Sequence, residues 1–168
     1  PNVPITNGRS LSRDLSKLLD LPCALIQEEH ALCLAERHFG GARGIDDFAM
    51  LDVSTGVGLG VMSGGRLLTG RSGLAGEIGH ITVQADGRPC GCGNLGCLET
   101  VACDSALAWL VSQRLGRRTT IGEVVELVRS GEYSLSMELD IIVRYLGIGV
   151  AAILNLFNPS TLFMHGRL

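Results

Sequence analysis

The sequence has 168 residues, of which 46% are hydrophobic and 18% charged, and its net charge is -3. This composition provides enough apolar material for a folded core and suits one domain, or one and a half. No basic patch stands out, so the chain by itself has no nucleic-acid footprint, and neither a signal peptide nor an apolar run of membrane-spanning length is evident. Because Pro1 stands where an initiator Met is expected, we expect both ends to be cuts.

Hydrophobic periodicity predicts a mixed α/β order of elements. In the first half, the expected elements are a helix at 10–19, a strand at 23–26, a helix at 29–39 and strands at 48–53, 57–62 and 66–69. In the second half, they are a strand at 81–84 within a loop-rich stretch, helices at about 98–115, 121–129 and 139–157, and a strand at 161–164. The Gly64-Gly65 pair predicts a hairpin between the third and fourth of the six strands.

Four residues in the loop-rich stretch have the spacing of metal ligands. His80, Cys90, Cys92 and Cys97 form the pattern H-x9-C-x-C-x4-C. Three thiolates and one imidazole make a closed tetrahedral set, which is typical of structural zinc, and the intervening glycines allow the loop to wrap an ion. The alternative is a chance cluster of buried or redox-active cysteines. Reduced thiols and a metal fit a cytoplasmic protein better than disulfides do.

The same region carries a resemblance to a known family. The run GLAGEIGHITVQADGRPCGCGNLGCLET closely resembles the signature of the ROK family, whose name stands for repressors, open reading frames and kinases. QEEHALCLAERHFGGARG is similar to the family's segment with its Asn-Asp pair, STGVGLGVMSGGRLLTG to its glycine-rich phosphate hairpin, and NLFNPSTLFMHGRL to the strand that enters its last nucleotide-contacting segment.

The resemblance covers essentially the whole chain and implies its fold class. That class is an α/β, actin-like and sugar-kinase-like (ribonuclease H-like) module, truncated here at both ends. Residues 1–168 are then a partial ROK domain, the sugar-binding and zinc-containing middle part, with no helix-turn-helix of their own.

The resemblance also implies a sugar site. Glu77, His80 and Glu99 match the residues that contact sugar hydroxyls, with Gln27 and Glu28 opposite them. Carboxylates accept hydrogen bonds from vicinal hydroxyls, and His80 can give one ring nitrogen to zinc while the other donates to the sugar. The expected ligand is a hexose or an amino sugar. Alternatively, Glu77 and Glu99 are solvated or only support the zinc loop.

The catalytic position departs from the pattern of the family's kinases. These use an Asp as general base after an Asn, whereas this chain has Glu28 after Gln27. Misplacing a base by about 1 Å can cost roughly a hundredfold in rate, so we expect Glu28 to be non-catalytic. Glu28 and Glu29 also suit the acidic first turn of a helix.

The nucleotide positions give a divided signal. Thr55 and Gly56 keep a kinase-like phosphate turn. His165 and Arg167, however, replace glycines expected in the family's last glycine run, and their side chains would crowd a nucleotide.

Three hypotheses follow. The first is the sugar-binding effector domain of a ROK transcriptional repressor that binds DNA through an upstream domain. The second is a glucokinase-like enzyme that phosphorylates a hexose with ATP, and ATP is a cofactor only in this case. The third is a kinase-derived interaction module without a ligand. The Gln27-Glu28 pair and His165 favour the first. We also expect a cytoplasmic homo-oligomer, most simply a two-fold dimer, with no membrane partner.

Overall fold

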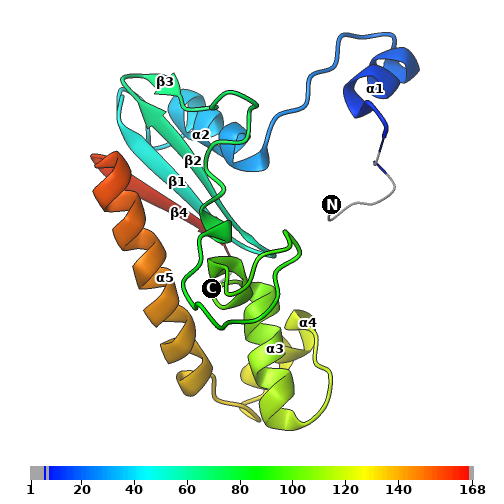
Figure 1. The fold of residues 1–168 in the computed structure, drawn as a ribbon, viewed down its shortest axis with the longest axis vertical. Coiled ribbons are helices and arrows are strands. Elements are labelled where there is room, and N and C mark those ends of the chain that lie inside the picture. Colours follow the sequence, from blue (N-terminus) through cyan, green and yellow to red (C-terminus); the bar gives the residue numbers. More distant parts are fainter. Residues whose placement is uncertain (1–5, 7, 167–168) are drawn as a thin grey trace.

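The computed structural model describes residue 6 and residues 8–166, and its centre is one four-stranded sheet (Figure 1). The strand order is β3-β2-β1-β4. Strand β1 (Phe48–Val53) pairs antiparallel with β2 (Val57–Ser63) and parallel with β4 (Thr161–Gly166), and β2 pairs with the short β3 (Arg66–Leu67). The parallel pair brings together two segments that lie more than a hundred positions apart, so the end of β4 adjoins the turn after β1.

Strand β1 is buried on both faces because a helix covers each side of the sheet. Its odd-numbered residues join the core formed with β2 and with α5 (Ser136–Phe157), in which Ile153 is fully buried. Its even-numbered residues Phe48 and Met50 pack with Cys33 of α2 (Glu28–Phe39) on the other face. This alternation follows from the two-residue period of a strand.

A close approach fixes α2 on β2. A Cβ atom at Gly60 would lie 2.5 Å from both Cys33 Sγ and the backbone oxygen of Glu29. Only glycine therefore permits this separation between the helix and the strand. The first turn of α2 is thereby held against the sheet.

Three helices form a separate apolar layer beside the sheet. Leu107 and Val111 of α3 (Asp104–Leu115) pack with residues of α5 and of α4 (Ile121–Arg129). Helix α4 begins where the sequence analysis expects because Thr120 and Glu123 form a reciprocal capping box.

A buried carboxylate, Glu138 of α5, connects α5 to α3 and to the segment between α4 and α5. Its side chain is only 5% exposed, and it accepts hydrogen bonds from the Tyr133 hydroxyl at 2.7 Å and from Arg114 at 3.2 Å. Burial disfavours the ionised form, but these hydrogen bonds hold the pKa of Glu138 below its ordinary value.

Helix α1 (Leu11–Leu19) lies apart from the rest of the fold in Figure 1 and buries none of its side chains. The strand expected at 23–26 is wrong. These residues form no strand and pair with no described strand, and Leu25 and Ile26 are exposed. An apolar run alone did not distinguish a buried strand from an uncovered linker.

Two other expectations from the sequence need correction. The strand expected at 81–84 is only a single bridge between Thr82 and Cys97. The helix expected over 98–115 is divided into the 3-10 turn η3 (Leu98–Thr100) and α3, because Cys103 is extended and the Asp104 amide donates to the Ser54 carbonyl. Helix α3 is thus anchored to the β1–β2 turn.

Helix α5 also corrects the expectation that no run reaches membrane-spanning length. Its 22 residues are long and apolar enough to cross a membrane by length and composition, and it is the one such helix among the described residues. Mostly buried core helices of soluble proteins pass the same test, but only 17% of the apolar window of α5 is buried, and Ile142, Gly149 and Ile153 are among the buried residues of this helix.

Candidate functional site

His80, Cys90, Cys92 and Cys97 converge in the loops between β3 and α3. Their ligand atoms all lie within 4.8 Å of one another. Cys90 Sγ is 3.6 Å from His80 Nδ1, and Cys92 Sγ is 3.7 Å from Cys97 Sγ. Zinc–sulfur bonds of about 2.3 Å in a tetrahedron separate two sulfur atoms by about 3.8 Å. The donor set and its spacing therefore fit a tetrahedral metal site.

The four residues of this cluster differ in burial, and the pKa values of the cysteine thiols differ as well. Cys97 is fully buried, and burial raises the pKa of its thiol to about 12. Cys92 is exposed, and a hydrogen bond from the Asn94 backbone lowers the pKa of its thiol. Because metals bind thiolates, a cation here would offset the burial that disfavours the charged form of Cys97.

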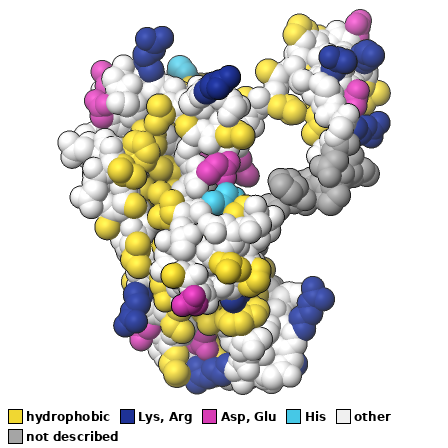
Figure 2. All heavy atoms as spheres, in the orientation of Figure 1, with side chains coloured by type: hydrophobic (Ala, Val, Ile, Leu, Met, Phe, Trp, Pro, Cys, Tyr) yellow, Lys and Arg dark blue, Asp and Glu magenta, His cyan; other side chains and the backbone are white. Residues whose placement is uncertain are grey.

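A polar cavity of about 260 Å³ adjoins this cluster on the other side of His80. Helix α2, the β1–β2 turn, the 3-10 turn η2 (Ile78–His80) with the residues before it, and η3 all contribute to its lining. Figure 2 shows acidic side chains gathered next to a histidine in the region between α2 and these loops. The cavity collects the residues singled out from the sequence: Gln27, Glu28, Thr55, Gly56, Glu77, His80 and Glu99.

Direct contacts order one side of the cavity. Gln27 Nε2 donates to Glu77 Oε1 at 2.6 Å, and His80 Nε2 lies 3.6 Å from Glu77 Oε2. His80 thus faces the thiols with Nδ1 and the cavity with Nε2. The buried His30 donates its Nε2 proton to the Ala75 carbonyl at 3.1 Å, which fastens the loop before Glu77 to α2.

The structure adds lining residues that the sequence analysis did not assign to the site. Glu29, Asp52 and Ser54 are among them. Asp52 is 5% exposed and accepts hydrogen bonds from the Ser54 hydroxyl at 2.8 Å and from His165 Nδ1 at 2.5 Å. The aspartate inside the otherwise apolar strand 48–53 was the available signal. Arg167 lies outside the described residues.

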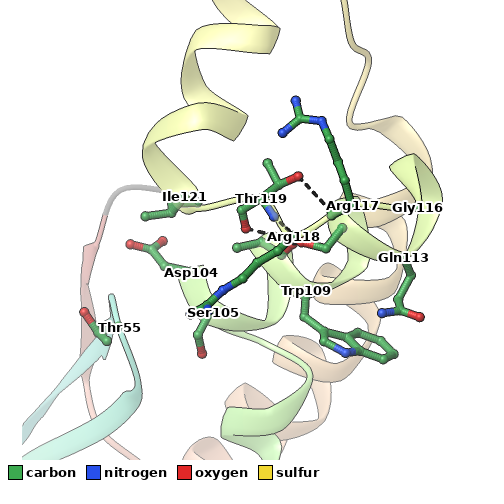
Figure 3. Close-up of a pocket in the computed structure, with 12 residues that line it drawn as sticks. Thr55, Asp104, Ser105, Trp109, Gln113, Gly116, Arg117, Arg118, Thr119 and Ile121 are labelled. Atoms are coloured by element: carbon green, nitrogen blue, oxygen red, sulfur yellow. Dashed lines mark hydrogen bonds between the residues drawn. The ribbon is translucent and has the colours of Figure 1, made fainter.

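A second and larger cavity, of about 720 Å³, lies between α3 and the start of α4 (Figure 3). Its lining includes Trp109, Arg117 and Arg118, and Thr55 of the β1–β2 turn lies on its far side near Asp104. The β1–β2 turn therefore borders both cavities.

Comparison with solved structures defines the class of fold. A glucokinase of Streptomyces griseus, solved in complex with glucose and AMPPNP, is similar with a TM-score of 0.84 and 29% identity, over 94% of this chain and 56% of that chain. The chain thus has a sugar-kinase-like α/β fold, as expected from its sequence. The ROK family model matches residues 1–168, and the chain belongs to the ROK family.

Its curated relatives include both regulators and kinases. The DNA-binding transcriptional dual regulator NagC of Escherichia coli is 33% identical over 100% of this chain and 43% of the relative. A glucokinase of Thermotoga maritima is 32% identical over 99% of this chain and 57% of the relative. The chain therefore spans about half the length of the relatives that it matches.

Proposed function

We propose that this chain is the sugar-binding, zinc-containing middle part of the effector domain of a ROK transcriptional regulator. The observation that carries this proposal is the hydrogen bond between His165 Nδ1 and Asp52. The His165 side chain stands where the family resemblance implies a glycine, and there it would crowd a nucleotide. The replacement of the Asn-Asp pair by Gln27 and Glu28 supports the same conclusion.

The sugar site is proposed to consist of Gln27, Glu28, Glu77, His80 and Glu99. Carboxylates accept hydrogen bonds from sugar hydroxyls, and the His80 Nε2–H can donate to another sugar oxygen. Zinc held by Nδ1 and the three thiolates would fix the imidazole tautomer that makes this donation. The metal is then structural, and it orients the sugar-binding residue rather than activating water.

A sugar kinase is the second candidate function, and one observation favours it. The 720 Å³ cavity beside Thr55 has room for a large ligand and includes two arginines. In this case Thr55 and Gly56 would contact ATP phosphates, and Glu28 would accept the proton of a sugar hydroxyl as its oxygen attacks the γ-phosphate.

The whole protein is proposed to bind DNA through a domain upstream of residue 1 and to act in the cytoplasm as a homo-oligomer. The similarity to NagC supports the regulator assignment. Many exposed apolar side chains, including Val143 and Leu156 of α5, support association through a further surface. Sedimentation of the complete protein at micromolar concentration should show a dimer or a larger oligomer, and a monomer alone would contradict this part of the proposal.

Calorimetry with the complete protein tests the sugar site. Glu77→Ala and Glu99→Ala should each weaken hexose or amino-sugar binding by more than about tenfold. Each substitution removes a carboxylate that accepts hydrogen bonds from sugar hydroxyls, and these hydroxyls would be left without partners in the cavity. Glu126→Ala, which removes an exposed carboxylate of α4 far from the cavity in sequence and structure, is the matched control. Unchanged affinity in both site variants would remove the assignment.

Phosphorylation of a hexose panel with ATP separates the two functions. The unmodified protein should show little or no turnover. Glu28→Asp restores the shorter carboxylate of the family's kinases and tests whether base placement is what limits activity. Robust turnover without any substitution would refute the regulator assignment of these positions.

A further inference from the structure

Helix α5 exposes more apolar surface than its composition leads one to expect. Its apolar window has a mean hydropathy of 1.8, yet only 17% of this window is buried. One side of the helix packs on the sheet through Ile153. A helix that is hydrophobic around most of its circumference is normally covered on more than one side. We therefore expect a further surface to cover the exposed side of α5.

The exposed side carries a regular stripe of residues. Met137, Ile141, Arg144 and Ile148 follow one another at alternating spacings of four and three positions. This spacing places them along one side of the helix, and it is the repeat with which two helices pack along a shared seam. The three apolar members are 62%, 39% and 44% exposed. Figure 2 shows apolar side chains along α5 with single charged side chains among them.

A groove of about 510 Å³ adjoins this 137–148 stripe, between α5, α3 and the loop residues 84–88. Its lining includes Trp109, which is 40% exposed, and the guanidinium carbon of Arg88 lies 4.0 Å from the centre of the Trp109 ring. Burial lowers the pKa of Arg88. Tryptophan and arginine are the side chains that most often dominate the binding energy of protein–protein interfaces. The groove therefore has the composition of an interface.

The charges around the groove are balanced and lack partners. Asp86 and Asp140 are acidic, and Arg88 and Arg144 are basic. Within the part of the chain that the structure describes, no ion pair reaches any of these four side chains, although Asp140 and Arg144 are one helical turn apart. A strongly acidic or basic partner could neutralise only half of them. A second copy of this chain offers the same balanced set and can pair all four.

We propose that the 137–148 stripe and the adjoining groove form the interface with a second copy of this chain, with the two α5 helices packed antiparallel. This inference rests on the proposed homo-oligomer and specifies the surface that forms it. Every contact across a two-fold axis occurs twice. With Ile141 beside the axis, Asp140 of each copy adjoins Arg144 of the other, and Met137 adjoins Ile148. The apolar residues fill the seam, and the two ion pairs set its register.

Sedimentation of the complete protein with reversed charges tests the inference. Arg144→Glu and Asp140→Lys each place like charges opposite one another, so each variant alone should self-associate at least about tenfold more weakly. An equimolar mixture of the two variants restores both ion pairs in a mixed dimer. The mixture should therefore associate at least about tenfold more tightly than either variant alone.

Arg129→Glu is the control, because it makes the same change of charge on exposed α4 and should leave self-association unchanged. A dimer that neither variant weakens, or a mixture no tighter than its components, would overturn the inference and leave the homo-oligomer intact. Variants that unfold by circular dichroism would indicate that another part of the complete protein covers the stripe, and would also overturn it. A monomeric unmodified protein would remove the homo-oligomer together with the inference.

Discussion

Removal of the metal should destabilise the protein. Between β3 and α3 the chain forms only two 3-10 turns of three residues each, so a bound ion would be its main cross-link. With free zinc at 100 to 1,000 times its dissociation constant, binding stabilises the folded state by about 2.7–4.1 kcal/mol. In a domain of this size each kcal/mol corresponds to about 2–4 °C, so a chelator should lower the unfolding temperature by about 5–16 °C.

Metal analysis and thermal unfolding together check this reasoning. Reduced protein should contain about one zinc per chain, and Cys97→Ala should abolish the zinc and the effect of the chelator. Cys103→Ala is the matched control, because Cys103 is equally buried but lies outside the cluster, so the variant should keep its zinc. Zinc-free protein with an unchanged unfolding temperature, or a disulfide between Cys92 and Cys97, would refute the metal assignment.

Three further outcomes are expected. Glu138→Gln should lower the free energy of unfolding by about 1–3 kcal/mol at pH 7. Because the folded-state pKa of Glu138 is depressed, its contribution is present above the ordinary value of 4.5 and is lost as the pH falls through the folded-state pKa, so denaturant titrations of the two proteins should converge at acidic pH. Gly60→Ala should lower the free energy of unfolding by about 1–3 kcal/mol, because the added methyl group displaces α2. Gly147→Ala, which has open space around it, should instead raise the free energy of unfolding by up to about 1 kcal/mol by stabilising α5. Equal effects of the two substitutions in thermal unfolding would contradict the packing argument. In metal-free protein, iodoacetamide followed by mass spectrometry should modify the exposed Cys92 first and the buried Cys33 and Cys97 last, because burial raises the pKa of each of these two thiols to about 12.

Local patterns predicted most of the regular elements. Helix α4 was expected at its observed bounds from local hydrophobic periodicity, and the capping box that the structure shows at its start also lies within four residues. The strands at 48–53 and 57–62 were also expected, since two apolar runs separated by a short turn are local features of the sequence. The pairing of β4 with β1 could not be read from a single strand, because it depends on a partner more than a hundred residues away.

The candidate site was foreseen in part. Family resemblance directed attention to Gln27, Glu77 and Glu99, and the structure brings them to one cavity. Glu29 was interpreted only as an acidic helix start. Its position in the cavity depends on the contact between α2 and the glycines of β2, which is a tertiary effect that sequence spacing does not report.

The imidazole of His80 forms a shared wall between two compartments, with the thiols 3.6 Å from one nitrogen and a cavity carboxylate 3.6 Å from the other. If metal binding at the thiols changes the affinity of the cavity for its ligand by some factor, ligand binding must change the affinity for the metal by the same factor. A ligand affinity measured in a chelating buffer would then differ from that of the metal-loaded protein. In the cell, the supply of the metal ion would then set the ligand concentration at which the protein responds.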